Sequence, residues 1–204
     1  GGEPLLRADV PELVRSLKAR GVPSIDVVAH SGGGWIVSYY LAYGDQATDA
    51  PKVNWSGAAD LRRVVLLGVP FHGGWPLFRD LVKGSSLPMM GSLLPADTMA
   101  SFPSIYCAAP QDDGHVLGTG GAPVAGASLS RFGFWQENHL GLLARTDLPA
   151  DIMAARSAFL ADKLARCGRF MGLLRLVDAG AAPAALSVLS ITGTGTQTPD
   201  KSFL

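Results

Sequence analysis

Residues 25–35 restrict the fold of this chain more than any other segment. An apolar run at 25–29 ends at the polar pair His30-Ser31, three glycines follow, and an apolar pattern with helical spacing begins at Trp35. A buried strand, a tight turn and a helix that starts at once account for this order. Ser31 would then lie at the carboxyl end of a strand, beside the unpaired N–H groups of a helix start, which favour negative charge.

The residues around Ser31 are small enough for a strained turn. Ala29 and Gly33 stand two positions before and after the serine, where we expect the chain to pass close to the neighbouring strand and helix. A serine held in this way is a candidate nucleophile, and the N–H of Gly32 is the candidate donor to the oxyanion of a tetrahedral intermediate. A glycine-rich turn that only packs closely, or that binds a phosphate, would give the same pattern.

The pattern after this turn predicts an α/β fold. A helix over about 35–43 and a polar surface connection at 45–60 lead to a second buried-strand pattern at 64–68. Strand, helix, loop and strand in this order predict a parallel sheet with a right-handed crossover. The almost continuous apolar character of 25–29 predicts that helices cover both faces of the sheet. Ligands should gather at the carboxyl ends of the strands.

Composition narrows the class of protein further. A chain of 204 residues suits one α/β domain, or one domain with an inserted cap. Lys plus Arg equals Asp plus Glu, at 17 each, which gives no reason to expect nucleic acid or an acidic partner. No apolar run is long enough to span a membrane, and no signal-peptide pattern is seen. Cys107 and Cys167 can form one bridge or none, and the sequence does not choose.

The regular pattern is lost in the middle of the chain, where Pro, Gly, Ser and Met are frequent. We expect residues 1–83 to form the N-terminal part of the core, 84–150 an inserted cap or lid, and 151–204 a helix and a late core strand. The helix is predicted over 151–176 and the strand over 184–191. Apolar loops with methionines suit an acyl chain, although an ordinary cap core explains them equally well.

The helix predicted over 151–176 is amphipathic. Its apolar stripe consists of Ile152, Ala155, Phe159, Leu160, Leu164 and Phe170. Its other face carries charged side chains that we expect to be solvated: Arg156, Asp162, Lys163 and Arg166.

Two places in the chain offer a base for Ser31. His72 lies on the glycine-rich loop after the second strand, although a histidine at the rim of the crevice explains it more simply. The segment 111–115 places Asp113 and His115 in the chain order serine, acid, histidine. Their two-residue separation is awkward for a triad, and an Asp-Gly turn also explains the segment. Its carboxylates suggest a cation as well, but nothing nearby completes a ligand set.

Four segments in the right order resemble the lecithin:cholesterol acyltransferase family, a lipase-like branch of the α/β-hydrolases with a G-x-S-x-G nucleophile elbow. They are residues 30–33, 67–73 with the leucine-rich helix and Gly84 that follow, 102–106, and 191–199. The resemblance implies an acyl-serine mechanism on a lipid ester, as in a lipase, phospholipase or acyltransferase, with no cofactor and no metal. A lipid or ester is then the substrate, and contact with a membrane or lipoprotein surface is expected.

The chain departs from this family in two ways. Ala29 stands where the family elbows usually have Gly, a small steric change. The family's catalytic acid and histidine follow the Gly-x-Gly-x-x-Thr-Pro turn found here at 193–199, and its oxyanion-hole loop precedes the elbow strand. We therefore expect an α/β-hydrolase core, a mostly parallel sheet with flanking helices and an inserted cap, that is incomplete at both ends. The alternative is a non-catalytic lipid-binding or interaction module with this fold.

Overall fold

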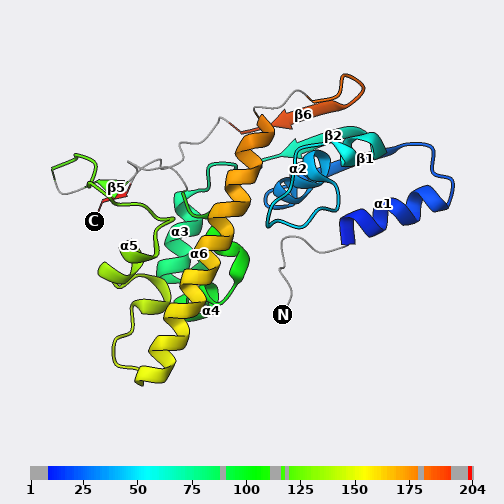
Figure 1. Ribbon diagram of the computed structural model, residues 1–204. Coiled ribbons are helices and arrows are strands. Elements are labelled where there is room, and N and C mark those ends of the chain that lie inside the picture. The colour runs from blue at the N-terminus through cyan, green and yellow to red at the C-terminus, as the bar shows by residue number, and fades with distance from the viewer. Residues whose placement is uncertain are drawn as a thin grey trace. The chain divides into compact units, whose positions relative to one another are not determined.

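The computed structural model in Figure 1 describes most of the chain. The described residues are 9–87, 91–110, 116–117, 120–178, 182–193 and 202–203. The chain forms two compact units: residues 1–71 and 170–196 make the first, and residues 72–169 and 197–204 make the second. The long helix α6 (Ala150–Asp178) contributes its last turns, from Phe170, to the first unit and the rest to the second.

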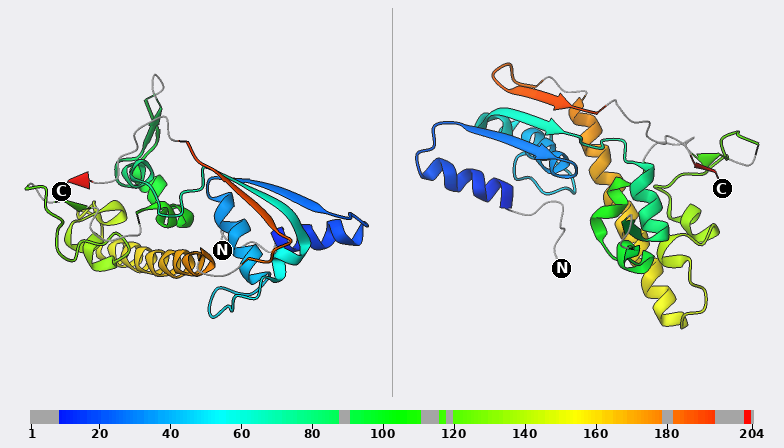
Figure 2. Two further views of the ribbon diagram at one scale, coloured as in Figure 1. Left: turned by 90° about the horizontal axis from the view of Figure 1, so that it is seen from above. Right: turned by 180° about the vertical axis from the view of Figure 1, so that it is seen from behind.

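A three-stranded parallel sheet forms the centre of the first unit (Figure 2). Its strands lie in the order β1 (Ile25–His30), β2 (Leu61–Leu67) and β6 (Ser187–Ile191). Between β1 and β2 the chain passes through helix α2 (Gly33–Tyr43) and the short 3-10 helix η1 (Ser56–Asp60). The predicted parallel βαβ arrangement is therefore confirmed, and the unit is a mixed α/β fold with a small parallel sheet flanked by helices.

The strands of this sheet end level with one another. His30 of β1 pairs with Leu67 of β2, and Leu67 pairs with Ile191 of β6. The ladder continues one residue further, because the N–H of Ser31 donates to the Leu67 carbonyl (3.0 Å) and the N–H of Gly68 donates to the Ile191 carbonyl (2.9 Å). Ser31 and the loop after β2 therefore start at the same edge of the sheet.

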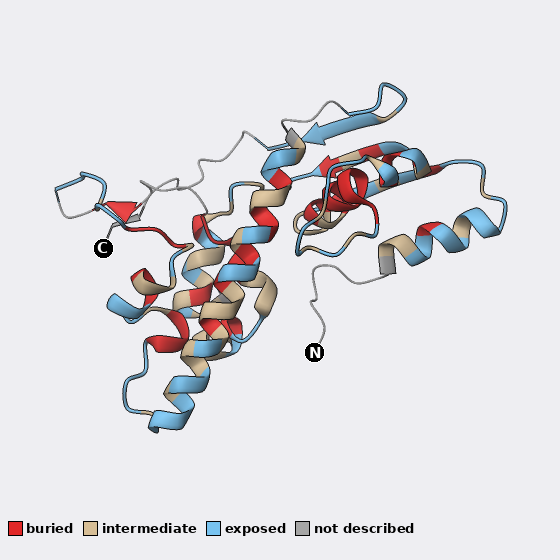
Figure 3. Ribbon diagram, viewed as in Figure 1, coloured by how far each residue is buried: buried red, intermediate tan, exposed pale blue. Residues whose placement is uncertain are grey.

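Helices cover one face of this sheet. Val64 and Leu66 are buried on that face, in one cluster with side chains of α2 and of α1 (Asp9–Ala19). On the other face Val28 is 72% exposed, and Leu189, aligned with it across β2, is 55% exposed. Strand β6 is exposed along its whole length, in pale blue in Figure 3. The expectation that both faces are covered is therefore wrong for the described residues, because α1 and α2 both contribute to the same core cluster.

Helix α2 is apolar on all sides and is buried over most of its length, as such a helix must be. Its tyrosine hydroxyls find acceptors: Tyr40 donates to the Asp60 carboxylate (2.9 Å) and Tyr43 to the Leu173 carbonyl of α6 (2.9 Å). Burial, with the hydrogen bond to Asp60, raises the pKa of Tyr40 well above its ordinary value, so its hydroxyl stays protonated and remains a donor. These bonds tie α2 to Asp60 at the end of η1 and to α6.

The connection from α2 to β2 is only partly a surface segment, contrary to the expectation for 45–60. Gly57 and Ala58 of η1 are buried. Gly57 lies so close to the Tyr40 carbonyl that a Cβ atom at this position would clash with it. Gly44 ends α2 as expected, with φ of 63° and its N–H donating to the Tyr40 carbonyl (2.8 Å).

A charge cluster lies at the amino end of the sheet, away from Ser31. Asp26 of β1 accepts hydrogen bonds from Arg62 and Arg63 of β2, each with a guanidinium nitrogen at 2.7 Å. The hydrogen bonds from Arg62 and then Arg63 hold the pKa of Asp26 well below its usual value. These hydrogen bonds link the first residues of β1 to those of β2.

Short elements make up most of the second unit. In chain order they are α3 (Trp75–Lys83), the antiparallel pair β3 (Ser85–Leu87) and β4 (Gly91–Leu94), α4 (Ala96–Ala100), η2 (Pro103–Ala108), β5 (Val116–Leu117), α5 (Phe132–Glu137), η3 (Gly141–Leu143) and β7 (Ser202–Phe203), which pairs with β5. Their core centres on Trp135, whose side chain is fully buried. The rings of Phe78 and Tyr106 each lie 5.7 Å from that of Trp135, edge to face.

The limits of the second unit differ from those of the expected cap. The cap was expected over 84–150, whereas this compact unit begins at His72 and runs to Arg169. Helix α3 and most of α6 thus belong to it. Its role as a cap over a substrate stays a prediction.

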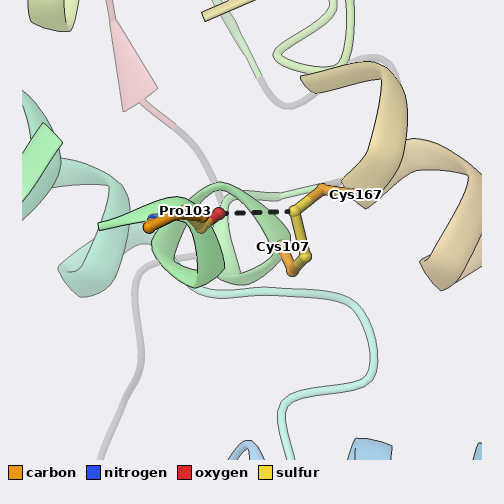
Figure 4. Close-up of a disulfide and its surroundings, with 3 residues drawn as sticks. All are labelled: Pro103, Cys107 and Cys167. Atoms are coloured by element: carbon orange, nitrogen blue, oxygen red, sulfur yellow. Dashed lines mark hydrogen bonds between the residues drawn. A yellow bond between two sulfur atoms is a disulfide. The ribbon is translucent and has the colours of Figure 1, made fainter. Parts of the chain in front are cut away.

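A disulfide answers the question that the sequence left open about the two cysteines. Cys107 of η2 is bonded to Cys167 of α6 (Figure 4), and both residues are buried. The Cys167 sulfur also lies 3.7 Å from the Pro103 carbonyl oxygen. We treat this as a contact, since a sulfur in a disulfide carries no proton to donate. The bond fixes η2 to the middle of α6 within the second unit.

Helix α6 confirms the helix predicted over 151–176, but its faces differ from the prediction. Leu160, Leu164 and Phe170 are buried, whereas Ile152 is 44% exposed. Arg156 is not solvated as expected: its guanidinium donates to both oxygens of the Asp97 carboxylate (3.1 and 2.9 Å) and to the carbonyl of Leu142. The pair lowers the pKa of Asp97 below its usual value. None of the helices in the described segments is long and apolar enough to cross a bilayer.

Candidate active site

The backbone of Ser31 has a conformation that serine rarely adopts. Its φ angle is 53°, in the left-handed region, and it stands directly between β1 and the turn that opens α2. For a residue with a Cβ atom this conformation costs about 1–2 kcal/mol, so it persists only where the surroundings impose it. The expected strained turn is therefore confirmed. Ser31 as a whole residue is partly exposed.

Hydrogen bonds hold the Ser31 backbone from two sides. Its N–H donates to the carbonyl of Leu67 in β2 (3.0 Å), and its carbonyl accepts from the N–H of Gly34 in α2 (3.0 Å). The carbonyl of Gly32 accepts from the N–H of Trp35 (3.2 Å). Within the described segments the N–H groups of Gly32 and Gly33 donate to no backbone carbonyl. They are the donors that a helix start leaves open to an anion.

The tightly packed glycine of this turn is Gly34, and the expectation for Gly33 was wrong. A Cβ atom on Gly33 would meet nothing within 4 Å. A Cβ atom on Gly34 would clash with both methyl groups of Val69, in the loop after β2. The third glycine of the run therefore allows the start of α2 to approach that loop. Ala29, the small residue before the turn, is buried.

Alanine substitutions at these two glycines test this packing. Gly34→Ala is expected to lower the free energy of unfolding by about 1–3 kcal/mol, because the new methyl group overpacks a buried contact. Gly33→Ala is the matched control, and it should raise that free energy by up to about 1 kcal/mol, since alanine suits a helix better than glycine. Urea unfolding of both variants measures the difference. Equal effects of the two alanines would contradict the Gly34–Val69 contact.

A base for Ser31 is not identified among the described residues of the first unit. Among the described residues none forms a hydrogen bond with the Ser31 hydroxyl. His72 is exposed and opens the second unit, whereas Ser31 belongs to the first, so their pairing stays a prediction. The loop of His72 is tied down at Gly74, whose N–H donates to the Ala108 carbonyl (2.8 Å). Asp113 and His115 lie outside the described residues.

Two residues of the loop after β2 contact the start of α2, and the sequence did not predict these contacts. Val69 and Pro70 had no assigned role beyond membership of the segment 67–73, yet Val69 packs on Gly34, and the Pro70 carbonyl accepts a hydrogen bond from the indole of Trp35 (3.2 Å). The only signal in the sequence is the third glycine, which a helix start does not need.

In the described segments no group of three or more His, Cys, Asp or Glu residues is placed to hold a metal ion.

Comparisons with known proteins give a likeness of fold. No protein-family model matches the sequence, and no curated protein matches it. Among solved structures, a chain of the crystal structure of the Tle4-Tli4 complex is similar, with a TM-score of 0.55 and 13% sequence identity. The match covers 86% of the present chain and 39% of that chain. The present chain therefore spans well under half the length of the similar one.

Proposed function

We propose that this protein transfers acyl groups from lipid esters through an acyl-serine intermediate on Ser31. The observation that carries the proposal is the positive φ of Ser31, 53°, at the junction of a parallel strand and a helix. That geometry presents a hydroxyl at the carboxyl edge of a sheet, where ligands of α/β proteins bind. It also places the serine next to the open amide of Gly32.

The chemistry assigns a role to each group at the turn. The Ser31 oxygen attacks the ester carbonyl carbon while a histidine accepts its proton, and the N–H of Gly32 donates to the oxyanion that forms. The intermediate collapses, the ester C–O bond breaks, and the leaving alcohol takes the proton from the histidine. Water or an acceptor alcohol then attacks the acyl-serine by the same steps, which releases the acyl group and restores the hydroxyl.

The histidine and the acid that orients it are required for this reaction. A free serine hydroxyl is a weak nucleophile without an adjacent base. His72, Asp113 and His115 are the candidates within the sequence, and the resemblance to the lecithin:cholesterol acyltransferase family implies partners beyond residue 204. The same resemblance supports a lipid ester as substrate, an α/β-hydrolase core around the sheet, and contact of the protein with a membrane or lipoprotein surface.

A long-chain alkyl fluorophosphonate tests the proposal on the full-length protein. We expect one phosphonyl adduct per molecule, located on Ser31 by mass spectrometry of peptides. Heat-denatured protein is the control and should not react, because the hydroxyl is activated only in the fold. Absence of the adduct from the native full-length protein would contradict the proposal and leave the non-catalytic lipid-binding or interaction module as the function.

A further inference from the structure

The indole of Trp35 reaches from the serine turn to the next loop of the sheet. Trp35 lies in the first turn of α2 and is 3% exposed. Its Nε1–H donates to the Pro70 carbonyl at 3.2 Å. Its six-membered ring lies one Cβ position away from Gly32, since an added Cβ atom on Gly32 would be in ordinary van der Waals contact with Cε3 (3.4 Å) and Cζ3 (3.5 Å). One side chain thus extends from beside the residue after Ser31 to the loop after β2.

A second contact lies beside it. Gly34 packs on Val69, the residue before Pro70, so two adjacent residues of α2 meet two adjacent residues of the loop. The two contacts differ in kind. The Gly34 contact depends on shape alone, whereas the Trp35 contact is a hydrogen bond with a fixed direction, which another apolar ring cannot make.

We propose that Trp35 is a positioning residue that fixes the direction of the Gly32 N–H. The inference rests on the proposed function, in which that N–H stabilises the oxyanion. Trp35 acts through Gly32: its backbone N–H donates to the Gly32 carbonyl (3.2 Å), its ring limits the space beside Gly32, and the bond to Pro70 keeps the ring from turning. Donors to an oxyanion must be held in place before the reaction, because a displacement well below 1 Å weakens them.

The consequence appears in the transition state rather than in substrate binding. The oxyanion forms only after Ser31 attacks, so a misdirected Gly32 N–H lowers kcat and leaves KM nearly unchanged. Complete loss of one such donor lowers kcat by about 10²–10³-fold. Trp35→Phe keeps the Gly32 N–H but no longer fixes its direction, and we expect a fall in kcat of roughly tenfold.

Two replacements of Trp35 in the full-length protein test the inference. Trp35→Phe removes the indole N–H together with part of the ring. Replacement of Trp35 by 3-benzothienylalanine exchanges the N–H for sulfur and keeps the size of the ring. Both should lower kcat for a soluble ester about tenfold with KM within about twofold, and both should bind a trifluoromethyl ketone, which forms an oxyanion on serine, about tenfold more weakly. Titration with the fluorophosphonate counts the folded, reactive molecules.

Trp55→Phe is the matched control. Trp55 belongs to the same unit and packs on its core, and we expect unchanged kcat per reactive molecule. A merely structural role of Trp35 would lower the number of reactive molecules and leave their kcat unchanged, which would overturn the inference. So would wild-type kcat in the benzothienyl protein. A wild-type protein that does not react with the fluorophosphonate would instead overturn the proposed function, and the role of Trp35 with it.

Discussion

Ser31→Ala is expected to lower kcat for ester hydrolysis by the full-length protein on the order of 10⁶-fold, the size of effect seen when the nucleophile of a serine hydrolase is removed. The alanine has no oxygen with which to form the acyl intermediate. The residual rate of the variant comes from the Gly32 amide and from substrate binding. Hydrolysis of a chromogenic ester, followed at high enzyme concentration, measures the residual rate.

The fold should survive this substitution, because Ser31 is held by its backbone and not by its hydroxyl. Ser24→Ala is the matched control: it removes a hydroxyl just before β1, at the opposite end of the same strand, and should leave kcat unchanged. A Ser31→Ala protein with a rate within tenfold of the wild type would show that the acyl group is carried elsewhere. Circular dichroism of both variants excludes unfolding as the cause of a loss.

Removal of the disulfide is expected to have the largest effect on stability. Cys107 and Cys167 are 60 residues apart, and release of a loop of this length increases the entropy of the unfolded chain. The double variant Cys107→Ala/Cys167→Ala should therefore lose about 4 kcal/mol in its free energy of unfolding. That is a large share of the roughly 5–15 kcal/mol typical of a folded domain.

Guanidinium unfolding of the oxidised wild type and of the double alanine variant measures this loss. Reduced wild type is the control for the two removed thiols, since it lacks the cross-link but keeps both sulfurs. We expect the reduced protein and the double variant to have similar stability. A loss below about 1 kcal/mol in both would mean that the bond between η2 and α6 does not restrain the unfolded chain.

The long elements could be predicted from the sequence because their patterns are long enough to be unambiguous. Strands β1 and β2 follow apolar runs, and α6 follows a stripe of helical period over many turns. Helix α2 starts at Gly33, two residues before the expected Trp35, because glycine adopts helical angles without contributing to an apolar pattern. The strain at Ser31 could also be foreseen, since only a tight turn fits between that strand and that helix.

The second unit could not be predicted because its elements are too short to show a period. Helices α4 and α5 have five and six residues, less than two turns each. Their positions depend on tertiary contacts, such as the packing of Phe78 and Tyr106 around Trp135. The sequence showed only that apolar residues were plentiful there.

Contacts between distant residues account for the errors at the site and on α6. A glycine run does not reveal which glycine meets a neighbour, and the neighbour of Gly34 is a valine 35 positions later. Arg156 was expected in water because it is charged, yet it lies four residues after Ile152 and four before Leu160, on the side of the apolar stripe, where Asp97 and Leu142 accept its hydrogen bonds. An apolar strand likewise shows that a face can be buried, without showing that a helix lies on it.

The left-handed backbone at Ser31 sets two demands on one position that no single residue meets. The backbone prefers glycine, whereas the proposed reaction requires a hydroxyl. A mutant library selected only for heat tolerance would therefore favour Ser31→Gly, and its most robust members would be chemically inert. Engineering for robustness at this turn has to leave position 31 fixed and look for gains elsewhere in the chain.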